Sequence, residues 1–290
     1  MPESINEWSD SLESETPEEA AATALSRLSI KYCNLRASMS SFHDHSDPDH
    51  IISTACAIDA EYAEWARSCP IQYIYNTVTL NERSDEVYSD HYHVYSNIWI
   101  ATVWNHYRSV RLLLNELILN QAYYVYQNIQ ESVLLWNDIS LLENQILASN
   151  ATLLQLSQDI CSSVPYFLGF NQNSKSTQTP KTVNGNLLLW PLYTAACTDL
   201  VSGMMRDWVA GRLRWISEVM GIRQATPLAY TLSIKQDLLE WQAEGTDSLD
   251  GSESISLSEP NGITGETDWR SATQVTQLRN AREESSCAMR

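Results

Sequence analysis

The chain has 290 residues and a formal net charge of −18 at pH 7. This length allows one large domain or two small ones, and a globular part of about 200 residues buries roughly 70% of its unfolded surface. Because so acidic a surface repels a phosphate backbone, the composition argues against direct binding of nucleic acid. Ten Trp and fourteen Tyr beside only nine Gly favour a helical core over a turn-rich β architecture.

The negative charge is concentrated at the two ends of the chain. Residues 1–24 contain seven acidic and no basic side chains, and residues 243–290 contain nine acidic and four basic ones, so the ends carry −12 of the −18. Both segments are rich in Ser and acid and poor in core residues, and we expect both to be disordered tails. Between them we expect one all-helical domain, residues 25–242, with a polar loop at 171–185.

Apolar residues at three- and four-residue spacing predict two helices at the start of this domain. The first runs from Leu25 to Arg36. Asp47 and Pro48 are typical of the start of the second, because the carboxylate can cap free N–H groups and proline already has a helical φ. Pro70 ends this second segment. Its apolar face consists of Ile51, Ala55, Ile58, Tyr62 and Trp65.

The next part of the chain combines a β-like segment with the longest helical pattern. Residues 71–80 are rich in β-branched and aromatic side chains, which favours an extended backbone. No partner strand is apparent, so the prediction includes no sheet. Aromatic and aliphatic side chains then recur with the 3.6-residue period of a helix, which predicts a helix from Tyr88 to Leu119 that is apolar on several sides. Such a helix is typical of the buried centre of a bundle.

Further helices are expected at 123–147, 153–164, 187–198, 205–219 and 226–242. Pro165 disfavours helical backbone at the residue before it, so we expect the second of these helices to end there. Gly221 is typical of a helix C-terminus. The predicted fold is therefore an all-α, irregular multi-helix bundle. Six aromatic side chains are expected to pack its core: Tyr92, Tyr95, Trp99, Trp104, Trp190 and Trp215.

The strongest metal-like pattern is the segment HDHSDPDH at residues 43–50. Its three weak candidate zinc ligands are His43, His45 and His50. A solvated loop whose Asp47 caps a helix explains the same residues without a metal, and we favour that interpretation. His91 and His93 lie within the predicted long helix, where side chains two residues apart point about 200° apart and cannot share an ion. We therefore predict no metal site.

No motif for catalysis or cofactor binding is present. The six cysteines, at 33, 56, 69, 161, 197 and 287, include no C-x2-C pair, so they cannot form a binuclear zinc cluster locally. The chain also lacks a G-x-S-x-G nucleophile motif and the glycine-rich loops that bind phosphate. We predict no catalytic residue, no cofactor and no enzymatic activity.

Four segments of the chain form a longer pattern. The two long ones are 88–119 (YSDHYHVYSNIWIATVWNHYRSVRLLLNELIL) and 187–225 (LLLWPLYTAACTDLVSGMMRDWVAGRLRWISEVMGIRQA). The two short ones are 51–65 (IISTACAIDAEYAEW) and 153–169 (LLQLSQDICSSVPYFLG). Together they resemble the C-terminal regulatory domain of fungal transcription factors of the binuclear zinc cluster family.

This resemblance implies a non-enzymatic fungal domain that regulates transcription by RNA polymerase II in the nucleus. Its expected partners are proteins, such as a DNA-binding subunit or the transcription machinery. Zinc is expected only if a missing N-terminal cluster exists. Three explanations for the missing cluster stay open: lost upstream exons, a natural co-regulator without its own DNA contact, or a role outside transcription.

A second hypothesis is a small-molecule-binding helical protein, or a co-regulator that acts through protein contacts. In the small-molecule case the Trp- and Tyr-rich interior of the bundle would form the pocket. The sequence has no basic run typical of a nuclear localisation signal. It also has no apolar run long enough to cross a bilayer, so we expect no membrane association.

Overall fold

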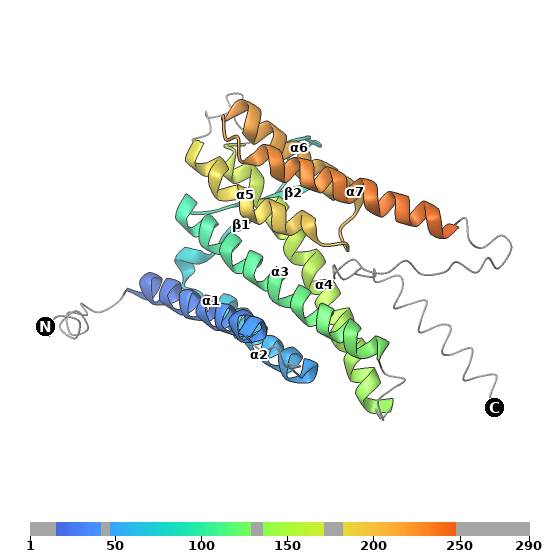
Figure 1. The fold of residues 1–290 in the computed structure, drawn as a ribbon. Coiled ribbons are helices and arrows are strands. Elements are labelled where there is room, and N and C mark those ends of the chain that lie inside the picture. Colours follow the sequence, from blue (N-terminus) through green and yellow to red (C-terminus); the bar gives the residue numbers. More distant parts are fainter. Residues whose placement is uncertain (1–15, 42–46, 129–135, 171–181, 248–290) are drawn as a thin grey trace, which may run out of the picture.

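The computed structural model describes residues 16–41, 47–128, 136–170 and 182–247 (Figure 1). In these ranges the chain forms seven α-helices and one antiparallel pair of strands. The elements are α1 (Pro17–Ser41), α2 (Pro48–Ser68), β1 (Asn76–Thr79), β2 (His91–Val94), α3 (Ile98–Gln127), α4 (Trp136–Phe167), α5 (Thr182–Cys197), α6 (Gly203–Val219) and α7 (Ala225–Asp247). The predicted mostly helical fold class is confirmed.

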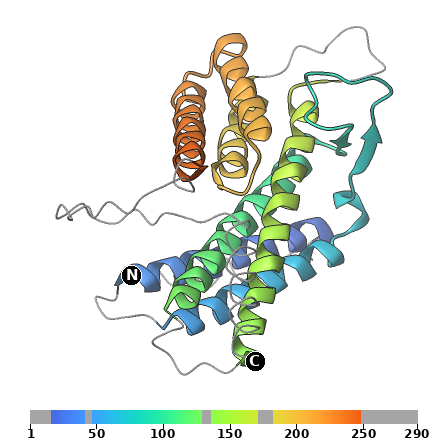
Figure 2. The ribbon, with the colours of Figure 1, turned by 90° about the vertical axis from the view of Figure 1, so that its right-hand side faces the viewer.

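Two long helices, α3 and α4, pack against each other and connect the two ends of the molecule. The pair α1 and α2 packs on one side of α3, and α5 contacts α3 and α4 on the other side. The last two helices, α6 and α7, pack on each other and on α5 (Figure 2). The core therefore runs along α3 and α4, and α5 joins the C-terminal pair to it.

Helix α1 begins inside the segment predicted to be a disordered tail. Thr16 and Glu19 form a reciprocal cap, in which each side chain accepts the backbone N–H of the other, at 3.3 and 2.9 Å. The alanines that follow are strong helix formers, and the Trp65 indole donates to the carbonyl of Ala21 at 2.8 Å. The prediction of disorder was therefore wrong for 17–24. It was also wrong for 243–247, which extend α7. Residues 1–15 and 248–290 lie outside the described ranges.

The prediction for α2 is confirmed in detail. The helix begins at Pro48, and the Asp47 carboxylate accepts the N–H of Asp49 at 3.1 Å. Its buried residues are the five that the periodicity gave. Arg111 of α3 reaches across to this helix and donates to both carboxylate oxygens of Asp59, each at 2.7 Å. The Asp47 cap thus fixes the start of α2, and the ion pair between Arg111 and Asp59 holds the helix against α3.

Residues 91–97 are not helical, which corrects the predicted start of the central helix. Strand β2 pairs antiparallel with β1, with His91 opposite Thr79, so the prediction of no sheet was also wrong. Helix α3 begins at Ile98 because the Asn97 side chain accepts the N–H of Ile100 at 2.9 Å. The alternating aromatic and β-branched residues before this cap suit a strand better than a helix.

Two other helices differ from the sequence prediction, and one predicted helix end is confirmed. Helix α4 is continuous from Trp136 to Phe167, where two separate helices were expected, and it includes Pro165. A proline this close to the helix end removes few backbone hydrogen bonds, so it is tolerated. Helix α5 starts at Thr182 within the predicted polar loop, and 171–181 lie outside the described ranges. At the end of α6, Gly221 has φ +73°, as a C-terminal glycine should.

Of the six predicted core aromatics, three are buried: Tyr92, Tyr95 and Trp104. Trp215 is half-buried and packs against the core. The prediction was wrong for Trp99, which is 48% exposed, and for Trp190, which is 56% exposed. Trp99 lies in the first turn of α3 and forms a T-shaped contact with Tyr73, with ring centroids 5.8 Å apart.

A buried arginine joins the strand pair to the central helices. Arg108 of α3 is 1% exposed and donates to the Tyr95 hydroxyl at 2.7 Å and to the side-chain amide oxygen of Asn105 at 3.0 Å. Its guanidinium lies over three aromatic rings, those of Tyr75, Tyr95 and Trp104, at 5.2 to 5.9 Å. The Asn105 amide then donates to Ser163 of α4 at 2.9 Å.

Removing one acceptor from Arg108 should be costly. In Tyr95→Phe the ring stays in place, but a charged N–H loses its buried partner, so we expect a loss of about 1.5–3 kcal/mol of unfolding free energy. Urea unfolding measures this loss. The matched control is Tyr75→Phe, since Tyr75 contributes only its ring to the arginine. Equal stabilities of the two variants would contradict the proposed role of the Tyr95 hydroxyl.

Candidate functional site

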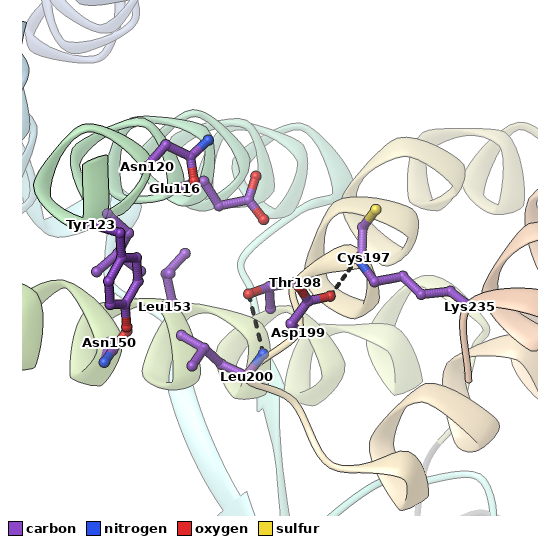
Figure 3. A pocket seen from close by; sticks show the side chains of 11 residues that line it. Glu116, Asn120, Tyr123, Asn150, Leu153, Cys197, Thr198, Asp199, Leu200 and Lys235 are labelled. Carbon is purple, nitrogen blue, oxygen red and sulfur yellow. Dashed lines mark hydrogen bonds and ion pairs between the residues drawn. The ribbon is translucent and has the colours of Figure 1, made fainter. Parts of the chain in front are cut away.

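A cavity of about 200 Å³ lies where α3, α4, the α5–α6 connection and α7 meet (Figure 3). Its lining comprises Glu116, Leu119, Asn120, Tyr123, Asn150, Leu153, Cys197, Thr198, Asp199, Leu200 and Lys235. The residues come from parts of the chain that are far apart in sequence. The cavity is therefore a product of the tertiary fold and not of one local motif.

Helical spacing explains how α3 and α4 contribute to the lining. Glu116, Asn120 and Tyr123 are four and three residues apart on α3, so they lie on one face of that helix. Asn150 and Leu153 are three residues apart on α4 and share a face in the same way. Polar residues thus occupy positions on two core helices that ordinarily carry apolar side chains.

Two of these polar side chains are buried without a partner. Asn150 is 5% exposed, and neither its amide nitrogen nor its oxygen has a hydrogen-bond partner among the described residues. The Tyr123 hydroxyl, on a side chain 8% exposed, also lacks one there. Burial raises the pKa of Tyr123, and the Asn150 side chain opposes that rise because it lies near the hydroxyl, although the two groups do not have the geometry of a hydrogen bond. Such unpaired groups are rare in folded proteins, so this cluster calls for an explanation.

Glu116 adds an acidic group to the same cavity. Burial, and to a lesser degree the negative charge of Asp199, raises the pKa of Glu116 to about 7, although the Lys235 ammonium opposes the shift. In the described part of the chain the Glu116 carboxyl makes no hydrogen bond or ion pair, and Figure 3 shows it directed toward the space between the helices. The carboxyl is therefore available to an occupant of the cavity.

The other two charges of the cavity neutralise each other. The Lys235 ammonium lies 2.7 Å from a carboxylate oxygen of Asp199, and both side chains are largely buried. This ion pair ties α7 to the α5–α6 connection. Because Lys235 balances the charge of Asp199, the net charge of the cavity above neutral pH is that of the Glu116 carboxylate.

The candidate metal ligands named from the sequence do not form a site. His50 is exposed in the first turn of α2, and His43 and His45 lie outside the described ranges. His91 and His93 share a strand, not a helix, with ring centroids 6.3 Å apart. Burial, and then the charge of Arg108, lowers the pKa of His93 to about 3. Within the described ranges no group of three or more His, Cys, Asp or Glu side chains is arranged to hold a metal ion.

Sequence reasoning missed the cavity and its residues. The pocket of the small-molecule hypothesis was expected among Trp and Tyr side chains, but the lining contains one Tyr and no Trp. One signal was present in the sequence: Glu116 interrupts the apolar run LLLNELIL of the central helix. An acid in such a run is either on the outer face or in a polar site, and the periodicity alone does not distinguish the two.

Comparisons with known proteins gave no match. No protein-family model, no curated protein and no solved structure is significantly similar to this chain. Across the described ranges, none of the helices combines the length and apolar character needed to span a membrane. Functional inference therefore rests on the residues and their geometry.

The raised pKa of Glu116 predicts a specific pH dependence of stability. Between pH 4.5 and about 7 the folded chain holds a proton that the unfolded chain has lost, so the contribution is complete below pH 4.5 and is lost as the pH rises through 7. We expect wild type to lose roughly 3 kcal/mol of unfolding free energy relative to Glu116→Gln between pH 4.5 and 8.5.

Urea unfolding of both proteins across this pH range provides the measurement. Glu218→Gln is the matched control, since Glu218 is an exposed glutamate of α6. Its stability should follow that of wild type at every pH. Parallel curves for wild type and Glu116→Gln would show that Glu116 titrates as an ordinary surface carboxyl.

Proposed function

We propose that this chain is a non-enzymatic regulatory domain that binds a small molecule in the cavity around Glu116 and Asn150. The observation that carries the proposal is the pair of unpartnered polar side chains, Asn150 and Tyr123, within that cavity. A buried polar group without a partner costs about 1–3 kcal/mol. A folded domain that retains several such atoms around one cavity is well suited to a ligand that satisfies them.

The position of the cavity supports a regulatory role. Its walls belong to the central helices α3 and α4, to the α5–α6 connection and to α7. Helix α7 packs on α5 and α6, so an occupant would bridge the central helices to the C-terminal pair. A ligand that binds one arrangement of these helices better than another shifts the population toward it.

The process that we propose is transcription. Support for it comes from the four segments that resemble the regulatory domain of fungal zinc cluster transcription factors. The chain would act in the nucleus through a DNA-binding subunit or the transcription machinery. Its acidic composition is unfavourable for direct DNA contact, which is consistent with a domain that depends on a protein partner.

Tethering the chain to DNA tests the transcriptional role. We expect residues 1–290, fused to a heterologous DNA-binding domain, to change transcription of a reporter in a fungal host, upward or downward, relative to the DNA-binding domain alone. Western blotting and chromatin immunoprecipitation establish that both proteins are present at the promoter. Equal reporter levels under those conditions would contradict a role in transcription and leave the ligand site unaffected.

Replacing Asn150 tests whether its side chain is kept for binding. Asn150→Leu removes two unpaired polar atoms at nearly constant volume, so we expect the ligand-free protein to gain about 1–3 kcal/mol of unfolding free energy. Urea unfolding measures the gain. Asn105→Leu is the contrasting variant and should be destabilising, because the Asn105 amide donates to Ser163 and its oxygen accepts from Arg108. Destabilisation by Asn150→Leu would indicate a structural role instead.

A further inference from the structure

We propose that the ligand of this cavity is a small organic amine, with its ammonium group at Glu116 and an apolar body between α3 and α4. This inference rests on the proposed ligand binding and adds the chemical class of the ligand. The unpaired carboxyl of Glu116, the unpaired side-chain amide of Asn150 on the facing helix and the leucines of the lining carry it.

The charges around the cavity favour a cationic ligand. The carboxyl of Glu116 points into the cavity and makes no hydrogen bond or ion pair within the described ranges. The one cationic side chain of the lining, Lys235, is already 2.7 Å from Asp199. An anionic ligand would therefore meet a carboxylate and no free cation, while a cationic one would meet an unpaired acceptor.

The hydrogen-bonding groups of the cavity also suit an ammonium group. An ammonium group has donors and no acceptor, and an ionised carboxylate accepts only, so the two are complementary. On the facing helix the side-chain amide of Asn150 has an unpaired oxygen and an unpaired nitrogen, and the oxygen can accept from a further donor of the ligand. Hydrogen bonds between such charged groups are roughly twice as strong as those between neutral groups. A neutral ligand would satisfy the amide but would gain less from Glu116.

The volume of the cavity and its apolar wall favour a compact ligand with a hydrocarbon part. Leu119, Leu153 and Leu200 form the apolar part of the lining. They suit the hydrocarbon part of a small molecule and offer it no polar partner. A volume of about 200 Å³ lies below the roughly 300–1,000 Å³ of pockets for drug-sized ligands. The cavity therefore fits a compact amine.

Three probes of similar size and different charge test the assignment: benzylamine, benzyl alcohol and benzoate. Titration calorimetry with the whole chain at pH 8, where Glu116 is mainly ionised, should show benzylamine binding at least about tenfold more tightly than benzyl alcohol. Benzoate should bind most weakly. Glu116→Gln should remove the preference for the amine, and Glu218→Gln, on the exposed face of α6, should keep it.

The outcomes separate the ligand class from the existence of the site. If benzyl alcohol binds as tightly as benzylamine, the assignment to an amine is wrong while ligand binding at the cavity stands. A preference for benzylamine that persists in Glu116→Gln places the cation elsewhere and also overturns the inference. If benzylamine does not bind, the inference fails, and the stability of Asn150→Leu decides independently whether the cavity is a ligand site.

Discussion

The buried charge of Arg108 constrains the end of strand β2 and the parts of α3 and α4 that pack against it. A guanidinium with no access to water is tolerated only when its donors are bonded and its charge is balanced by nearby polarisable groups. Here the partners come from three separate elements. Tyr95 follows strand β2, Asn105 lies on α3 itself, and the chain of hydrogen bonds continues to Ser163 on α4. The end of strand β2 is therefore held against α3 and α4 by polar contacts inside an aromatic shell.

The same helix contains a second buried polar centre that is organised in the opposite way. Glu116 lies eight residues after Arg108, about 12 Å along α3. Arg108 and Asn105 are hydrogen-bonded to Tyr95 and to Ser163 of α4, whereas the side-chain amide of Asn150 and the hydroxyl of Tyr123 have no hydrogen-bond partner among the described residues. The contrast supports a structural role for the first centre and a binding role for the second.

Local signals in the sequence were sufficient for some elements and insufficient for others. Asp47, Pro48 and the apolar period predicted α2 and its buried face, since a cap and a helical stripe are encoded within one turn or two. Gly221 marked the end of α6 for the same reason. The strand pair was missed because each strand is four residues long and is stabilised mainly by its partner, eleven residues away in the chain. Glu116 and Asn150 meet only through the packing of α3 on α4, so no spacing in the sequence links them.

The Asp199–Lys235 ion pair connects the cavity to the C-terminal helices. It ties α7 to the α5–α6 segment, and its two charges act on the Glu116 carboxyl in opposite directions. The Lys235 ammonium lowers the pKa of Glu116 and the Asp199 carboxylate raises it, so the pair largely cancels its own effect there. Burial is then the main reason that the pKa of Glu116 is raised. The acidity of one side chain on the central helix therefore depends on how closely α3, α4 and the C-terminal helices pack around it.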